Sequence, residues 1–129
     1  MPTEIRHILF RAAEVVVAVA EYSRRIRQPL PPGSVVKWSM QADEEGGSVR
    51  FTLTIDDESG DSRRDGGVVR HDVTIEGPAL AAALILYCRD RRIPLPSGAE
   101  KALQRFGDLL ALVVTRNPRQ EPMPRFTPL

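Results

Sequence analysis

Few side chains in this sequence could act as nucleophiles, general bases or metal ligands. They are two histidines, His7 and His71, and one cysteine, Cys88. A catalytic triad or a zinc site needs several such groups at fixed geometry, and no Cys or His pair here has metal-ligand spacing. Asp72 follows His71, but neighbouring residues of a strand point to opposite faces. We therefore predict no catalytic residues, no metal and no cofactor, and a protein that is not an enzyme.

The local context of these three residues favours structural roles. His7 is expected in the first turn of a helix, and His71 on the apolar face of a strand. Cys88 ends an apolar stretch, which is typical of a buried and inert thiol. Each residue is thus interpreted as part of the fold.

Glycines and carboxylates do not form a recognisable ligand loop. Gly46-Gly47 and Gly66-Gly67 are interpreted as turns, because no lysine follows them in the pattern of a phosphate-binding loop. The clustered acids lack the alternating ligands and closing glutamate of a calcium loop; they are Asp56, Asp57, Glu58 and Asp61. We expect solvated loops at 43–47 and 57–67.

Arginines form two clusters that could bind a partner. The first group is Arg24, Arg25 and Arg27, and the second is Arg89, Arg91 and Arg92. The first group falls in the last turn of an expected helix and the second ends another; positive charge there suits the helix dipole, and each group could also contact phosphates. Aromatic residues make up 5% of the chain, which is few for a base-stacking platform. Arginine in place of lysine is also what the codon usage of a GC-rich bacterial genome would produce.

Length and composition indicate one globular domain. The chain has 129 residues, of which 42% are hydrophobic, and its net charge is +1. Acidic residues concentrate in 34–76 and basic residues on either side of it, which suits docking to a partner of opposite charge. A chain with a single cysteine cannot form an intramolecular disulfide, which argues for a reducing compartment. No signal peptide is recognised at the start, and the longest uncharged apolar run, Ala79–Cys88, is well short of the roughly 20 residues that cross a membrane. We predict a cytoplasmic protein with no membrane association.

The hydrophobic pattern predicts an α+β fold of order α-β-β-β-α-α-β. A long N-terminal helix is predicted over 3–28, because apolar residues recur at spacings of three and four. The other predicted elements are an antiparallel meander of strands over 34–41, 48–56 and 68–76, a helix over 77–88, a helix that starts with a capping box at 97–100, and an edge strand over 109–115. The helices are expected to pack on one face of the sheet. We identify no internal repeat.

The domain is predicted to span 1–116. The tail, 117–129, holds Pro118, Pro122, Pro124 and Pro128, and is predicted to be disordered or extended. The predicted order of helix, three antiparallel strands and helix over 4–92 is similar to that of the double-stranded RNA-binding domain. That family places lysines at the start of its second helix. Here that start, Gly77–Ala82, is uncharged, so the family's function is not transferred.

These observations favour a non-enzymatic protein-interaction domain of bacterial origin, with an unidentified protein or a second copy of the chain as its partner. The predicted first helix is apolar on more than one face at Val15–Ala20, and the helix over 77–88 is apolar nearly all round. A homodimer would cover both. The alternative is a nucleic-acid-binding protein that uses the arginine clusters at the helix ends.

Overall fold

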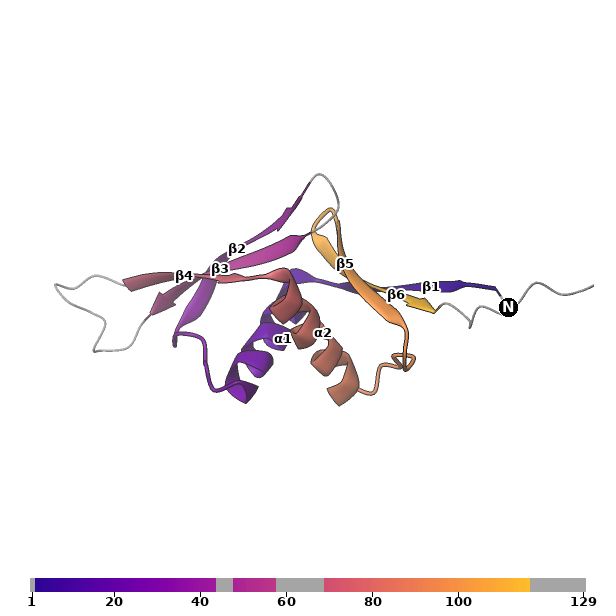
Figure 1. Cartoon of the computed structure of the whole chain (residues 1–129). Helices are drawn as coiled ribbons and strands as arrows, with labels where there is room; N and C mark the ends of the chain where they lie inside the picture. The colour runs from indigo at the N-terminus through magenta and orange to yellow at the C-terminus, as the bar shows by residue number, and fades with distance from the viewer. Residues whose placement is uncertain (1, 44–47, 58–68, 117–129) are drawn as a thin grey trace, which may run out of the picture.

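The computed structural model describes residues 2–43, 48–57 and 69–116. Within them, six strands and two helices follow the order β-α-β-β-β-α-β-β. The elements are β1 (Glu4–Phe10), α1 (Ala12–Arg25), β2 (Ser34–Ala42), β3 (Val49–Asp57), β4 (Val69–Ile75), α2 (Gly77–Asp90), β5 (Glu100–Phe106) and β6 (Leu109–Arg116). Sheet A has the strand order β1-β6-β5 and sheet B the order β2-β3-β4, and all pairings are antiparallel. Both helices lie against the same side of the two sheets (Figure 1). The predicted tail, and nearly all of the two predicted loops, lie outside the described residues.

The predicted N-terminal helix is wrong in its first third. Residues 4–10 form strand β1, and helix α1 begins only at Ala12, after Arg11, whose backbone N–H donates to the Glu14 carboxylate at 3.1 Å. Strand β1 pairs with β6 along its whole length, from Glu4 opposite Arg116 to Phe10 opposite Leu110. A strand needs such a distant partner for its backbone groups, which local spacing of apolar residues does not reveal.

The predicted third helix and edge strand are also wrong. Residues 100–106 form strand β5, and a tight turn at Gly107, whose φ is +59°, leads directly into β6. A positive φ at this position is typical of a two-residue hairpin turn. Strand β6 is the centre of sheet A rather than an edge, because β1 and β5 pair with its two sides. The fold therefore has two three-stranded sheets in place of the single sheet that was predicted.

The chain contains an internal repeat, contrary to the prediction. The units β1-α1-β2-β3 and β4-α2-β5-β6 have the same element order, and from the first strand to the start of the hairpin their equivalent residues lie 65 positions apart, as do Arg25 and Asp90. Residues 22–33 read YSRRIRQPLPPG and residues 87–98 read YCRDRRIPLPSG. The sequence similarity is thus strongest in the segment that follows each helix.

Both helices end in the same way. Arg27 and Arg92 have φ values of +60° and +56°, and the next residue of each segment, Gln28 or Ile93, donates its backbone N–H to a carbonyl five residues earlier, at 2.9 and 2.8 Å. This is the Schellman motif, which usually has glycine at the residue with positive φ. The two units also exchange their first strands, because β1 joins the hairpin of the second unit and β4 that of the first.

A pseudo-two-fold axis relates the two units. Two equivalent residues can contact each other only near such an axis, and two pairs of equivalent residues do so. Arg25 forms an ion pair with Asp90, and the Arg105 guanidinium donates to the Met40 carbonyl at 2.8 Å. The axis therefore passes between the helix ends and between β2 and β5.

The core lies between the helices and the two sheets. Its fully buried side chains come in equivalent sets from the two units; they include Val15, Val19, Phe51 and Leu53 from the first, and Leu80, Leu84, Leu110 and Leu112 from the second. Each such side chain contributes about 1.5–3 kcal/mol by its burial. The apolar faces of both helices are thus covered within one chain, including most of Val15–Ala20, where only Val17 is classed as exposed, at 43%.

Candidate interaction surfaces

The two sheets differ sharply on the faces that point away from the helices. In sheet B this outer face carries a polar ladder across β3 and β4. The Thr52 and Thr74 hydroxyls lie 3.3 Å apart, and the Thr54 hydroxyl donates to Asp72 at 2.8 Å. Arg70 also donates to Asp56, at 2.8 Å. Such cross-strand pairs suit a face that water covers.

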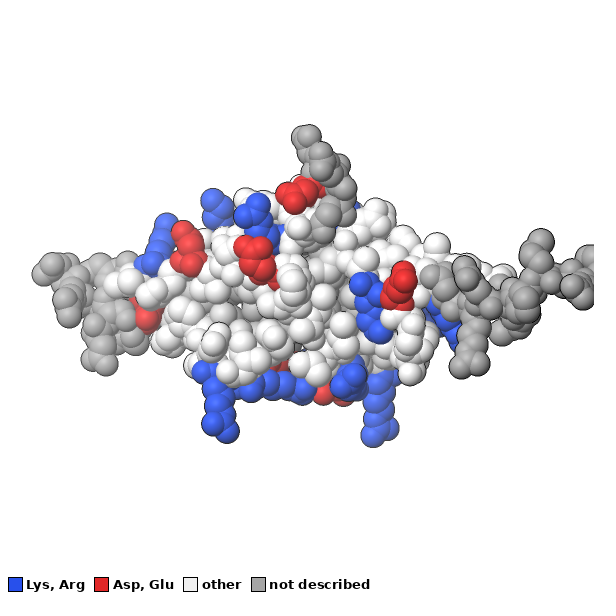
Figure 2. All heavy atoms as spheres, in the orientation of Figure 1, with Lys and Arg blue, Asp and Glu red and all other residues white. Residues whose placement is uncertain are grey.

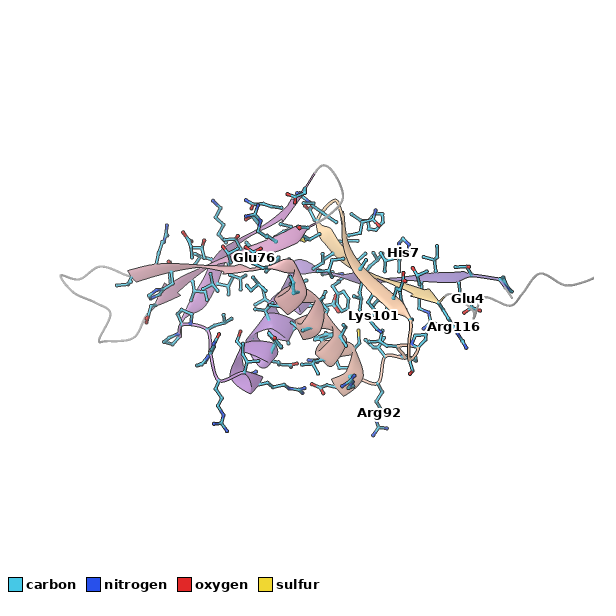
Figure 3. The ribbon with its side chains drawn as sticks, in the orientation of Figure 1. Glu4, His7, Glu76, Arg92, Lys101 and Arg116 are labelled. Carbon is cyan, nitrogen blue, oxygen red and sulfur yellow. The ribbon has the colours of Figure 1, made fainter. Side chains whose placement is uncertain are left out.

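The outer face of sheet A is apolar at most of the equivalent positions, and its polar residues on β5 are Gln104 and Glu100. Ile5 and Leu9 stand where β4 has Arg70 and Thr74, and they are 63% and 51% exposed. Phe106, 39% exposed, lies against the His7 ring with 5.5 Å between ring centroids. Figure 3 shows His7 on the side of β1 that faces away from the helices. Leu109, Ala111 and Val113 of β6 share this face by strand alternation and register.

The internal repeat shows whether the fold requires the apolar outer residues of sheet A. Sheet B shows that the same backbone arrangement is compatible with a polar outer face. The apolar residues of sheet A are therefore not required by the fold. Contiguous exposed apolar surface is typical of interaction sites. We call the set Ile5, His7, Leu9, Phe106 and Val113 the sheet A face.

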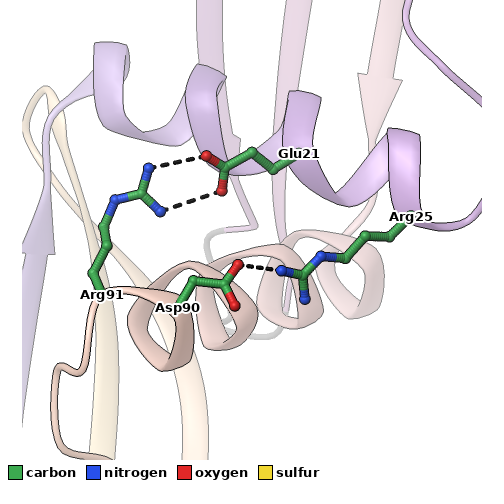
Figure 4. Close-up of polar contacts among 4 residues, drawn as sticks. All are labelled: Glu21, Arg25, Asp90 and Arg91. Carbon is green, nitrogen blue, oxygen red and sulfur yellow. Dashed lines mark hydrogen bonds and ion pairs between the residues drawn. The ribbon is translucent and has the colours of Figure 1, made fainter.

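All six arginines singled out in the sequence lie at the ends of the two helices. Two of them are held by carboxylates of the other helix (Figure 4): Arg25 pairs with Asp90, and the Arg91 guanidinium donates to both Glu21 oxygens at 3.0 and 3.2 Å. Arg91 also lies over the Tyr87 ring, 3.6 Å from its centroid. The hydrogen bond from Arg91 lowers the pKa of Glu21, and that from Arg25 lowers the pKa of Asp90. These two arginines therefore join the helices.

The other four arginines form no ion pair with any described residue; they are Arg24, Arg27, Arg89 and Arg92. All four are exposed. Figure 2 shows basic side chains projecting from the side of the molecule where the helices end, and Figure 3 shows Arg92 extending away from the sheets. The fold thus brings two arginine clusters from distant parts of the sequence to one side of the molecule.

The residues considered for catalysis do not come together. His7 lies in strand β1 rather than in a helical turn, and it is exposed. His71 approaches Asp57, with 3.4 Å between Nε2 and Oδ2, rather than its neighbour Asp72. Cys88 is fully buried in the core, where desolvation raises the pKa of its thiol. Among the described residues there is no group of three or more His, Cys, Asp or Glu side chains that could hold a metal ion.

The sheet A face is the surface that the sequence analysis missed. Ile5, His7 and Leu9 alternate with Arg6 and Ile8, a period-two signal that was present but also matched helical spacing. None of the described helices has the length and apolar character needed to cross a membrane. No protein-family model matches the chain, and no curated protein or solved structure is significantly similar to it.

Proposed function

We propose that this protein is a non-enzymatic interaction module that forms a homodimer through the sheet A face. The observation that carries the proposal is the contrast between the outer faces of the two sheets. Equivalent positions hold Ile5 and Leu9 in sheet A but Arg70 and Thr74 in sheet B. Burial of the exposed apolar side chains against a partner would contribute about 25 cal/mol for each Å² removed from water.

A second copy of the chain is the partner that best matches this face. The centre of the sheet A face bears no carboxylate, lysine or arginine, so its complement is another uncharged apolar surface. The outer face of sheet B is polar, and the apolar faces of both helices are buried within the chain. Among the described sheet and helix faces, the sheet A face of a second copy thus provides the required surface.

The proposed dimer has two-fold symmetry with sheet A stacked on sheet A. Two sheets that pack face to face lie about 10 Å apart, and their strands cross at about 30°. Each patch then contacts the same patch of the other chain, which gives a closed dimer. We place this dimer in the cytoplasm, because a single buried thiol suits a reducing compartment.

The test is the molar mass of the purified chain, measured by light scattering during size exclusion, with a pair of matched variants. Leu9→Lys places a charge in the proposed interface, and Thr74→Lys places the same charge at the equivalent position of sheet B. The unchanged protein and Thr74→Lys should have the mass of two chains, and Leu9→Lys the mass of one.

A second variant shows whether a monomeric Leu9→Lys results from loss of the interface or from misfolding. The double change Leu9→Thr and Phe106→Gln installs the residues that sheet B carries at the same places, Thr74 and Gln41. It should also be monomeric, with far-UV circular dichroism like that of the unchanged protein. A monomeric unchanged protein at 100 µM, or a dimer that persists in both folded variants, would contradict the proposal.

The arginines at the helix ends support a second candidate function, which is nucleic-acid binding. Arg24 and Arg27 at the end of α1 and Arg89 and Arg92 at the end of α2 have no carboxylate partners among the described residues, and the Arg25–Asp90 ion pair joins the two helix ends. Binding of a labelled RNA or DNA duplex should then weaken steeply between 50 and 200 mM salt. Arg27→Glu combined with Arg92→Glu should abolish it. No binding at 50 mM salt would exclude this function.

A further inference from the structure

A cavity of about 520 Å³ lies between the end of α2, the segment that follows it and strand β5. Small-molecule sites commonly have volumes of about 300–1,000 Å³. The wall of this cavity includes Arg89 and Arg92 at the helix end, Lys101 of β5, and the apolar residues Ile85, Ile93 and Leu95. None of the described acidic side chains lines it.

Lys101 lies on the side of sheet A that faces the helices, which also carries Arg6 and Arg105. It pairs with Val114 of β6, which is 2% exposed, so its side chain is on the side of sheet A that faces the helices. Figure 3 shows Lys101 between α2 and β5. Lys101 is half-buried there, whereas Arg6 and Arg105 are exposed. The Lys101 ammonium donates to the Ala99 carbonyl at 3.1 Å, so one of its three N–H donors has a protein acceptor.

The repeat shows that the fold does not require this lysine. The first unit has valines there: Val35 pairs with Ile55, the counterpart of Val114, and Val36 follows at the irregularity in β2. A second cavity, of about 410 Å³, is also bordered by Lys101 and is lined by Pro78, Ala81 and Leu103 among others. We call the two cavities together the α2–β5 groove, and Lys101 borders both of them.

The charges around the groove favour an anion. Arg25 and Arg91 are held by carboxylates, whereas Arg89 and Arg92 at the groove have no ion pair among the described residues. The groove thus combines positive charge with apolar wall, which suits an amphipathic ligand.

We propose that this groove binds a small molecule that has one carboxylate or phosphate group and a short apolar chain. The anionic group lies between Lys101 and Arg89, and the apolar chain lies along Ile85 and Leu95. Arg92 stands at the mouth of the groove. The proposal does not rest on the homodimer, because Lys101 is on the opposite side of sheet A from Ile5 and Leu9.

Calorimetric titration of the full chain at low salt tests the proposal with three probes, which are octanoate, hexyl phosphate and inorganic phosphate. Octanoate or hexyl phosphate should bind, and the tighter of the two identifies the anionic group. Inorganic phosphate should bind at least tenfold more weakly than the better amphipathic probe. Absence of binding by both amphipathic probes at 5 mM would overturn the proposal, and equally tight binding of inorganic phosphate would overturn its apolar part.

The two lysines of the chain provide a matched pair of variants. Lys101→Met should weaken binding of the better probe at least tenfold, and Lys37→Met, which removes the same charge from the exposed start of β2, should leave it unchanged. Acetylation followed by mass spectrometry gives an independent measurement. The bound probe should slow acetylation of Lys101 and not of Lys37. Equal effects at both lysines in either experiment would refute the assignment.

Discussion

Replacement of Gly33 by alanine should destabilise the protein far more than the same replacement at Gly98. The two glycines are equivalent in the repeat, and both have positive φ, +136° and +77°. A Cβ at Gly33 would lie 1.9 Å from the Asp56 carbonyl oxygen and 2.7 Å from its carbon. A Cβ at Gly98 would have no atom within 4 Å. The pair therefore separates backbone strain from close approach.

The magnitudes follow from these distances. Gly98→Ala incurs only the cost of an L-residue at positive φ, about 1–2 kcal/mol, which is partly offset by the lower entropy of the unfolded chain. Gly33→Ala needs a further separation of more than about 1 Å between β2 and β3, where Ser34 pairs with Asp56. Rupture of this strand end brings the expected loss to about 3–5 kcal/mol. That is a large part of the 5–15 kcal/mol typical of a domain.

Urea unfolding monitored by Trp38 fluorescence measures both losses. Trp38 is the only tryptophan of the chain and stacks on Phe51, with ring centroids 6.1 Å apart. With an m-value of about 2 kcal/mol/M, the midpoint should fall by roughly 2 M for Gly33→Ala and by less than about 1 M for Gly98→Ala. Midpoints of the two variants within about 0.3 M of each other would refute the close approach of Gly33 to β3.

Three further predictions concern the helix ends. Arg27→Gly and Arg92→Gly should each raise the free energy of unfolding in urea by about 0.5–1 kcal/mol, because glycine adopts positive φ without strain. A lower free energy of unfolding in either variant would show that the contacts of the arginine outweigh the strain. The Cys88 thiol should react with Ellman's reagent only after unfolding, because burial covers the thiol and raises its pKa. Rapid reaction of the native protein would contradict the position of Cys88 in the core. Since Arg91 lowers the pKa of Glu21, the stability that this pair contributes should be complete above the ordinary value of 4.5 and be lost as the pH falls through the lower folded value. The difference in urea midpoint between the unchanged protein and Arg91→Gln should therefore shrink at low pH to the part that the Tyr87 contact contributes. A difference at pH 2 as large as that at pH 7 would contradict the role of the Glu21 pair.

Much of the local structure could be predicted from local signals. The Gly77-Pro78 start and the apolar run after it indicated α2, and regular alternation over Val49–Ile55 indicated β3. The repeat was also visible in the sequence, since residues 22–33 and 87–98 share seven identities at the same spacing. It was missed because most other equivalent positions, such as Arg70 and Ile5, differ in residue type.

The sheet A face and the α2–β5 groove were much less predictable. Ile5, Ile8 and Leu9 fit helical spacing as well as strand alternation, so the sequence pattern did not identify the outward-facing residues. Lys101 was expected in a helix that begins near Ser97. Its place on the helix-facing side of a sheet could therefore not be predicted. Both surfaces therefore depended on the assignment of β1 and β5 as strands.

By itself, the sequence determined which segments are apolar on one face or on two, where the helices end in arginine, and that chemically reactive side chains are scarce. Only the tertiary structure decided that β1 and β5 are strands, that β6 is central rather than at an edge, and that the two units exchange strands. The physical reason is the location of the hydrogen-bond partners. The backbone N–H and C=O groups of a helix form hydrogen bonds with residues only a few positions away. The backbone groups of β1 instead pair with β6, which is distant in the sequence.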